Sequence, residues 1–459
     1  MASEGALSFD QARARAAHAW SMALGKISTV GATAAQQEAF ATALFHAETM
    51  PHDLTGDGSW PAGQSHYEDL YTLWDTYRTV NPLLTILEPA REAGIVRTLL
   101  WIDRHDGGFL PDARVATNNG ITQVGSNAEI VIGDAILEGL GGFDRTAAYR
   151  AILRDAEVSS PHPGSEGRDL HDYARLGYVA TDEGRSASRT LEYAYEDYVV
   201  SEVAALLGHT ATAATLSRRA EDWENLWDPA QQSIVPRNAG GSFLEPFDPT
   251  QVFYGFDAPF YEGSALEWST FVPQDVQGLV NRLGGETAAA GWLGNVMNCC
   301  YDPTNEPDLL AAYEFIQMGH PELTDYWVSR LLADYGDQPD GLPGNDDAGT
   351  LSAWYVWSAI GLYPNAGQPY YFIGSPVFTS TRIALGNGRT FTINAPDSSA
   401  QNIYVEAATL DGVALDRAFI TSGELERGGT LTLQMGASPD GWGSSIAPPS
   451  LSAALPPSQ

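Results

Sequence analysis

The sequence predicts a mainly α-helical protein, an α/α toroid barrel followed by a small all-β module. Hydrophobic residues recur at i, i+3 and i+4 over most of the chain from Ser8 to Leu362, which indicates helices. Long polar loops separate these stretches, as expected where paired helices form a ring and their loops gather at one end to form a pocket. After Pro364 the pattern changes to short alternating or β-branched runs, which are typical of strands.

The helical spacing is clear at residues 34–45, 70–87, 91–101, 129–140, 191–207 and 309–332. Loops rich in Gly, Pro, Asp and Asn lie at residues 51–65, 159–177, 236–262 and 338–349. Because these loops also carry aromatic and acidic side chains, we expect them to line the pocket.

Short strands are predicted at residues 370–373, 382–385, 390–394, 403–408, 413–420 and 430–435. Turn signals such as Gly386-Asn387-Gly388 and Asp411-Gly412 separate them. The predicted organisation is therefore a catalytic barrel at residues 1–365 and a β-sandwich-like module at residues 366–443. Residues 444–459 are rich in Ser, Pro and Ala without a pattern, so a disordered tail is expected there.

The chain is strongly acidic, with 58 acidic and 24 basic residues and a formal net charge of −34. This charge repels nucleic acid and anionic lipid and tolerates divalent cations, so no nucleic-acid partner is expected. No apolar run approaches the roughly 18 residues of a membrane span, and no membrane insertion is expected. Charged residues such as Arg13 and Arg15 interrupt the first 25 positions, so these do not form a signal peptide.

The two cysteines, Cys299 and Cys300, are adjacent in the sequence. Neighbouring cysteines rarely form an unstrained disulfide with each other, so we expect two half-buried, small apolar residues. Their spacing also excludes a structural metal site built on thiolates.

The loops combine aromatic and acidic side chains, whereas a phosphate-binding glycine loop, a zinc-protease helix motif and a nucleophile elbow are absent from the sequence. Aromatic faces stack on sugar rings and carboxylates bind hydroxyls, so this combination suits a carbohydrate site. Ordinary core aromatics would give the same composition.

Two acidic segments are candidates for chemistry. Gly344-Asn345-Asp346-Asp347 precedes a helix that is expected to begin near Leu351. Carboxylates at a helix N-terminus stay ionised, as a general base or a ligand of a hard metal ion requires, although capping the helix would use the same residues. Glu262 and Glu267, flanked by aromatic residues, are placed to be held neutral by desolvation, as a general acid requires.

Several longer motifs carry a resemblance that covers nearly the whole chain. They are Leu73-Trp74-Asp75-Thr76-Tyr77-Arg78, Val179-Ala180-Thr181-Asp182-Glu183, Ser188-Arg189-Thr190-Leu191-Glu192-Tyr193-Ala194, Asn305-Glu306-Pro307, Gly341-Leu342-Pro343-Gly344-Asn345-Asp346-Asp347, Ser352-Ala353-Trp354-Tyr355 and Gly361-Leu362-Tyr363-Pro364. In these motifs the chain resembles glycoside hydrolase family 92, the calcium-dependent inverting exo-α-mannosidases.

The resemblance implies an (α/α)6 barrel that packs against an N-terminal β-sandwich domain, which this chain is expected to lack. It implies Ca²⁺ as the cofactor, mannose-containing glycans as partners and a secreted or periplasmic location. It also implies hydrolysis with inversion by two carboxyl groups roughly 6.5–9.5 Å apart. A preference for α-1,2 linkages is part of the same expectation.

The resemblance also assigns roles to single residues. Asp347 is the expected general base, with Asp346 as the alternative, and Glu262 is the expected general acid, with Glu267 as the alternative. The expected calcium ligands are Asn305, Glu306 and Asp347, and the expected substrate-binding residues are Trp74, Asp75, Arg78, Trp268 and Asn345. Arg189, Glu192 and Tyr193 are expected to brace the barrel interior.

The chain departs from the family pattern near the expected acid and metal ligands. It has Ser264, Leu266, Glu267 and Trp268 where relatives commonly read Glu-Gly-Asn-Ala-Trp-Gln-Tyr, and Asp308 and Leu309 where a His-His pair commonly follows Asn-Glu-Pro. Three hypotheses therefore remain open at this point: an active α-mannosidase, a mannan-binding barrel without catalysis, and a hydrolase of mannose-1-phosphate diesters.

Overall fold

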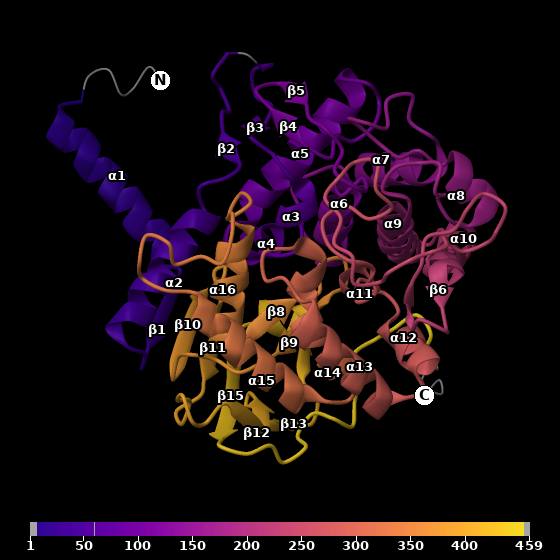
Figure 1. Cartoon of the computed structure of the whole chain (residues 1–459). Helices are drawn as coiled ribbons and strands as arrows, with labels where there is room; N and C mark the ends of the chain where they lie inside the picture. The colour runs from indigo at the N-terminus through magenta and orange to yellow at the C-terminus, as the bar shows by residue number, and fades with distance from the viewer. Residues whose placement is uncertain (1–6, 59, 454–459) are drawn as a thin grey trace.

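The computed structural model describes residues 7–58 and 60–453. Its α-helices are α1 (Phe9–Leu24), α2 (Ala34–Ala47), α3 (Leu73–Thr76), α4 (Val80–Leu87), α5 (Pro89–His105), α6 (Ala128–Leu137), α7 (Arg145–Glu157), α8 (His171–Leu176), α9 (Ser186–Leu206), α10 (Thr210–Arg219), α11 (Ala265–Trp268), α12 (Val276–Leu283), α13 (Glu286–Cys299), α14 (Ala311–Gln317), α15 (Pro321–Leu331), α16 (Thr350–Ile360) and α17 (Ser422–Glu426). Short 3₁₀ helices are η1 (Asp222–Leu226), η2 (Glu306–Leu310) and η3 (Leu332–Asp334). The helices form one body with α1 projecting from it, as Figure 1 shows.

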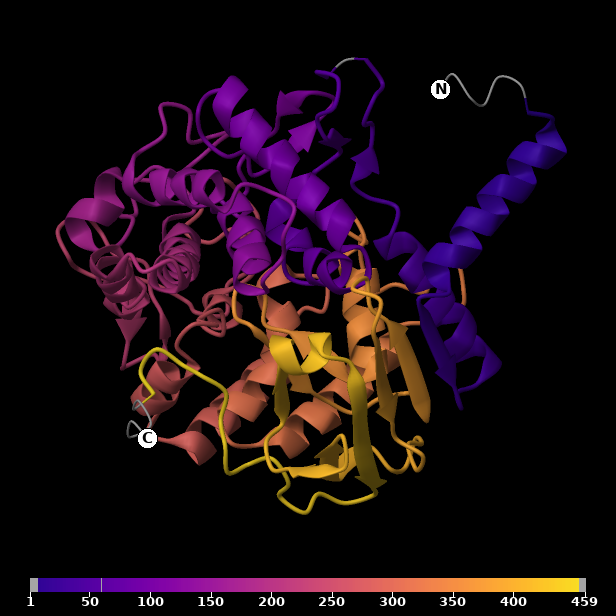
Figure 2. The same ribbon diagram turned by 180° about the vertical axis from the view of Figure 1, so that it is seen from behind.

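The C-terminal strands form a module against one end of the helical body, seen in yellow from behind in Figure 2. A six-stranded sheet has the order β1 (Ile27–Val30), β10 (Ser380–Ala384), β11 (Thr390–Asn394), β15 (Gly429–Gly436), β12 (Tyr404–Leu410) and β13 (Val413–Leu415). A three-stranded sheet has the order β14 (Phe419–Thr421), β9 (Tyr370–Ile373) and β8 (Leu362–Pro364). Three short hairpins lie in the helical part: β2 (His52–Asp53) with β3 (Tyr67–Glu68), β4 (Arg114–Val115) with β5 (Asn118–Asn119), and β6 (Trp227–Asp228) with β7 (Ser233–Ile234). The predicted fold class, a helical barrel with a C-terminal β module, is confirmed.

Helix α9 is buried on nearly all sides because α6, α7 and α10 pack against it. Its buried acidic groups are paired. Arg168 donates a hydrogen bond of 2.9 Å to Asp197, forms an ion pair of 2.9 Å with Glu196 and also binds Glu129. One guanidinium thus serves three carboxylates, which offsets the cost of burying charge inside the barrel.

Two stretches predicted as continuous helices are interrupted. Residues 309–332 divide into η2, α14 and α15, because Gly319 takes a left-handed conformation (φ +78°) and Pro321 begins the next helix. Residues 70–87 divide into α3 and α4, where Thr79 leaves the helical region with φ −141°. The helical spacing continues across both breaks, so the sequence pattern did not reveal them.

Strand β1 joins the C-terminal sheet from the beginning of the chain, which the sequence did not predict. It pairs antiparallel with β10, and Figure 1 shows the two side by side. The strand has only four residues, and its sequence Ile-Ser-Thr-Val does not alternate apolar and polar side chains, so it was not recognised. The barrel and the module therefore share a sheet.

Residues 444–453 also differ from the expected disordered tail. The hydroxyl of Ser452 donates to Asp275 at 2.9 Å, its backbone N–H donates to the same carboxylate at 2.8 Å, and Leu451 donates to the carbonyl of Gln274 at 2.8 Å. These bonds attach the segment to the start of α12. The expected disorder of residues 454–459 concerns positions outside the described residues.

The buried carboxyl of Glu92 on α5 makes the stability of this fold depend on pH. It accepts hydrogen bonds from the amide of Asn81 at 3.1 and 3.3 Å, and burial raises its pKa from 4.5 to about 8. The unfolded chain releases this proton near the ordinary pKa while the folded chain keeps it. This contribution to stability is therefore complete below the ordinary value and is lost as the pH rises towards 8.

We expect Glu92→Gln to remove this loss, because a neutral amide does not titrate in this range. Its N–H can also donate a hydrogen bond to the Oδ1 of Asn81. That oxygen is buried and lacks a hydrogen-bond partner within the described part of the chain. Thermal unfolding at about pH 5 and about pH 8 measures the effect: the melting temperature of the variant relative to the wild type should rise between these values. Glu38→Gln, at an exposed position of α2, is the matched control. A relative melting temperature that does not change with pH contradicts the prediction.

Candidate active site

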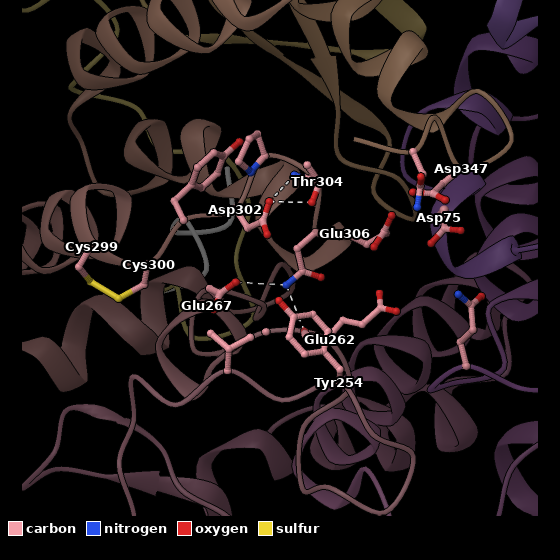
Figure 3. Close-up of a pocket in the computed structure, with 17 residues that line it drawn as sticks. Asp75, Tyr254, Glu262, Glu267, Cys299, Cys300, Asp302, Thr304, Glu306 and Asp347 are labelled. Carbon is pink, nitrogen blue, oxygen red and sulfur yellow. Dashed lines mark hydrogen bonds between the residues drawn. A yellow bond between two sulfur atoms is a disulfide. The ribbon is translucent and has the colours of Figure 1, made fainter. Parts of the chain in front are cut away.

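A cavity of about 470 Å³ opens between loops that are distant in sequence. Its lining residues, drawn in Figure 3, are Asp75, Gln123, Val252, Tyr254, Glu262, Gly263, Glu267, Cys299, Cys300, Tyr301, Asp302, Pro303, Thr304, Asn305, Glu306, Asn345 and Asp347. They come from the start of α3, the loops before α6 and α11, the segment between α13 and η2, and the loop before α16. The structure thus brings the two acidic segments together in one pocket.

The loop before α16 separates the two neighbouring aspartates. Asp346 faces the helix, where its Oδ1 accepts a hydrogen bond of 2.9 Å from the backbone N–H of Ser352. Asp347, Ala348 and Gly349 then take three successive left-handed conformations, with φ of 46°, 57° and 95°. Such backbone is strained for residues with a Cβ and persists where the surroundings impose it. The result is that Asp346 caps the helix and Asp347 lines the pocket.

The pKa of Asp347 lies above its ordinary value, contrary to the expected effect of a helix N-terminus. Burial is the largest cause, followed by the negative charges of Glu262 and Asp346, and together they raise the pKa to about 6. A hydrogen bond with Glu306 acts in the opposite direction. The group is still mostly ionised at neutral pH.

Glu262 also stands on a left-handed backbone, with φ 45°, and Gly263 follows with φ 109°. The indole N–H of Trp268 and the side-chain amide of Asn305 both donate to the carbonyl of Glu262, at 2.9 and 3.1 Å. Its side chain is half-buried, and this burial raises its pKa, while a hydrogen bond with the hydroxyl of Tyr261 lowers it. The backbone of Glu262 is therefore held in place on the pocket wall.

Glu267 is engaged in holding its own helix. One carboxylate oxygen accepts the backbone N–H of Ser264 at 2.6 Å, closing the capping box of α11, and the other accepts the amide of Asn305 at 3.3 Å. The side chain is buried. Of the two candidate acids, Glu262 is thus the one whose carboxyl faces the cavity without such a structural task.

Asp75, Glu306 and Asp347 form a cluster of carboxyl groups that point toward one another in Figure 3. Burial, the charge of Asp347 and other neighbours raise the pKa of Glu306 to about 8, and burial and the charge of Glu306 raise the pKa of Asp75 well above its ordinary value. Arg78 partly offsets both shifts. The cluster concentrates negative charge that protons or a cation must neutralise.

The donor atoms of this cluster fit a hard cation such as Ca²⁺. Asn305 Oδ1 and Glu306 Oε1 are buried and have no hydrogen-bond partner among residues 7–58 and 60–453. Amide and carboxylate oxygens are the ligands that Ca²⁺ prefers. Over the same residues, no three His, Cys, Asp or Glu side chains are grouped closely enough to hold a metal ion by themselves. The amide oxygen of Asn305, backbone carbonyls or water would have to complete such a site.

Three residues expected to bind substrate lie behind the pocket wall. Trp74 and Trp268 are fully buried and stack with ring centroids 6.2 Å apart. The indole of Trp74 donates to Glu192 at 2.6 Å, and Arg78 donates to the same carboxylate at 3.1 Å. Their placement differs from the expected sugar-contacting floor because each is used to support the wall. Of the other two expected substrate-binding residues, Asp75 and Asn345 do line the cavity.

Arg189, Glu192 and Tyr193, the residues expected to brace the barrel interior, lie on α9 and make two separate sets of contacts. Glu192 is buried, as expected, but its carboxylate binds Arg78 and Trp74. The side chain of Arg189 instead bonds the hydroxyl of Tyr193 at 3.3 Å. Glu192 thus binds residues more than a hundred positions away, whereas Arg189 binds a neighbour on its own helix.

Cys299 and Cys300 form a disulfide with each other, which corrects the expectation of two unlinked residues. Helix α13 ends at Cys299, and Cys300 leaves the helical conformation with φ −138°. The rule that neighbouring cysteines rarely bond to each other took no account of this helix end between them. The disulfide lines the pocket together with Asp302 and Thr304, for which the sequence carried no signal. Tyr254, one of the loop aromatics, is also part of the lining.

Comparison with known proteins matches these features to one family. The family model described as the glycosyl hydrolase family 92 catalytic domain matches residues 1–437. A protein of Arthroderma benhamiae named as an uncharacterized secreted glycosidase is 31% identical over 489 residues, which cover 97% of this chain and 60% of the relative.

Solved structures with similar folds belong to the same family. A family GH92 α-mannosidase from Bacteroides thetaiotaomicron, in complex with mannoimidazole, matches with a TM-score of 0.91 and 28% identity, over 97% of this chain and 62% of that chain. A family GH92 inverting mannosidase from Bacteroides thetaiotaomicron VPI-5482 matches with a TM-score of 0.87 and 28% identity, over 96% of this chain and 65% of that chain. The chain therefore spans less than two thirds of the length of these relatives.

Proposed function

The chain belongs to glycosyl hydrolase family 92, and we propose that its pocket hydrolyses terminal α-linked mannose from glycans with inversion, with a preference for α-1,2 linkages. The names of the solved relatives, an α-mannosidase bound to mannoimidazole and an inverting mannosidase, support the substrate class and the stereochemistry. The observation that carries the proposal is the pair of Glu262 and Asp347. Both are half-buried carboxyl groups on left-handed backbone, they line one cavity, and burial raises the pKa of each.

The proposed reaction needs Glu262 as the proton donor and Asp347 as the base. Burial raises the pKa of Glu262, which favours the acid form that gives its proton to the glycosidic oxygen. Asp347, with a pKa of about 6, is mostly a carboxylate at neutral pH and removes a proton from the attacking water. The new bond from water to the anomeric carbon forms on the face opposite to the breaking C–O bond, so the configuration inverts.

We also propose that Asn305, Glu306 and Asp347 hold Ca²⁺. When bound, the ion supplies positive charge that neutralises the cluster and coordinates hydroxyl groups of the sugar. Residues of the chain bind the sugar and position the acid. Asp75 and Asn345 offer oxygen and nitrogen atoms to the sugar, and the buried wall of Trp74 and Trp268 keeps Glu262 in place.

We further propose a secreted location, which the name of the fungal relative supports. Across the described residues, no helix is long and apolar enough to cross a bilayer. Detection of the natural protein in the culture medium of its source tests this proposal, and its retention inside the cells contradicts it.

The first test separates the two neighbouring aspartates. Asp347→Asn should lower kcat by about 10²–10⁴-fold, the range of general base catalysis, with an unchanged fold. Asp346→Asn weakens the cap of α16, so it should lower the melting temperature and reduce kcat far less. Mannose release from an α-mannobiose gives the rates, and NMR of the first product formed gives its anomeric configuration. Equal losses in both variants, or release of the α-anomer, would contradict the proposal. Binding of the sugar without any turnover by the wild type would instead indicate a binding protein.

The second test separates the two candidate acids. Glu262→Gln should lower turnover of a mannobiose by about 10²–10⁴-fold, because its leaving oxygen needs a proton, and should affect an activated aryl mannoside much less. Glu267→Gln keeps the geometry but weakens the capping box of α11, so it should lower the melting temperature and reduce both rates by a similar factor. A dependence on the leaving group in Glu267→Gln alone would assign the acid to that residue. Turnover that survives loss of both carboxyls would favour mannose-1-phosphate diesters as substrates.

The third test concerns the cation. Added Ca²⁺ should raise the melting temperature of the metal-free protein, because the ion binds the folded state and offsets the repulsion between the carboxylates. Asn305→Ala and Glu306→Gln should reduce that rise, and the same effect should appear as weaker binding in calorimetry. Glu314→Gln, a buried acid on α14 outside the pocket lining, is the matched control. A rise that is identical in all four proteins places the ion elsewhere.

A further inference from the structure

The pocket is elongated, and its two ends differ in chemistry. Figure 3 shows Asp75, Asp347 and Glu306 at one end and the disulfide of Cys299 and Cys300 at the other. Glu262, Glu267 and Tyr254 lie between the two ends in this view. The acidic end suits the hydroxyl groups of a sugar and a cation, whereas the disulfide end offers sulfur atoms and apolar carbon. The mechanism proposed above uses the acidic end and Glu262, and it gives no role to the disulfide end.

The disulfide end is exposed to the ligand side of the pocket. Cys299 is exposed and Cys300 is half-buried, although disulfides and cysteines generally prefer the interior. Tyr254 and Val252, on the loop before α11, line the same cavity with exposed fractions of 73% and 46%. Polarisable sulfur and an aromatic ring are surfaces against which the C–H face of a sugar ring packs.

The disulfide is also held at a fixed position relative to the candidate acid. The backbone N–H groups of Cys300 and Tyr301 both bond the carbonyl of Val296, at 2.9 and 3.0 Å. Asp302 accepts the N–H of Thr304 at 2.9 Å, which closes the turn that follows. Asn305, at the end of this turn, binds the carbonyl of Glu262 at 3.1 Å. A short, hydrogen-bonded segment thus connects the disulfide to the loop of the acid.

We propose that the disulfide of Cys299 and Cys300, together with Tyr254, forms a subsite that binds the sugar ring on the leaving-group side of the cleaved bond. This inference rests on the proposed function. The acid Glu262 must reach the glycosidic oxygen, and a terminal sugar held among Asp75, Glu306 and Asp347 places the remaining glycan beyond Glu262. The disulfide and Tyr254 line the part of the cavity that this second ring would enter. The ligand of the subsite is therefore a hexose of an oligosaccharide.

The test compares substrates that have or lack the second ring. Cys299→Ser combined with Cys300→Ser should raise KM for an α-mannobiose by about three- to tenfold, the range expected for losing one stacking surface. It should leave kcat, and the kinetics with methyl α-mannoside, within about twofold of the wild type. Tyr254→Ala should have the same selective effect and does not depend on the disulfide for folding. Asn298→Ala, exposed on the last turn of α13 outside the pocket lining, is the matched control.

Calorimetry keeps this inference distinct from the proposed function. In proteins that also carry Asp347→Asn, loss of the disulfide should weaken binding of mannobiose and leave binding of mannose unchanged. If the wild type releases no mannose from any substrate, the proposed function fails, and the binding comparison still decides whether the subsite exists. Equal weakening for mannose and mannobiose, or no weakening in the Cys variant and in Tyr254→Ala, would overturn the subsite.

Discussion

The side-chain amide of Asn305 connects the parts of the pocket that must act together. Its nitrogen donates to the carbonyl of Glu262 at 3.1 Å and to the carboxylate of Glu267 at 3.3 Å, and its residue directly precedes Glu306. Through these bonds the loop of the candidate acid, the capping box of α11 and the carboxyl cluster keep one relative position. Two hydrogen bonds of about 1 kcal/mol each are small in energy, so their importance lies in geometry.

The site is costly for folding, and the surrounding barrel supports it. Asp75 and Glu306 are buried beside the half-buried Asp347. Glu262 and Asp347 stand on strained backbone, and each such residue destabilises the folded state by about 1–3 kcal/mol. Buried helices such as α9, with their paired charges, supply rigidity around this arrangement. Trp74 and Trp268 belong to this supporting structure, because they lie fully buried behind the pocket wall and not on its surface.

Much of the fold and part of the site could be predicted from the sequence. Helix and strand positions follow from local periodicity, so α2, α5, β9 and β11 were predicted nearly as they occur. The loop with Asp347 was predicted because glycines and carboxylates before a helix form a local signal. The burial of Trp74 and Arg78 behind the wall could not be predicted, because both bind Glu192, which is more than a hundred residues away in the sequence. The disulfide was missed for another reason. The prediction followed the general rule that adjacent cysteines rarely bond to each other, and the end of α13 between these two was not considered.

The pairing of β1 with β10 also constrains the order in which the molecule can assemble. The hydroxyl of Thr379 bonds the carbonyl of Val30 across 349 residues of chain. A ribosome therefore releases β1 long before its partner exists, and this strand waits unpaired while the helices form. Conversely, a C-terminal module cut out at residue 365 would expose the backbone edge of β10, which attracts other strands and aggregates. The first and last parts of the described chain thus contribute strands to one sheet, across the boundary that composition suggests.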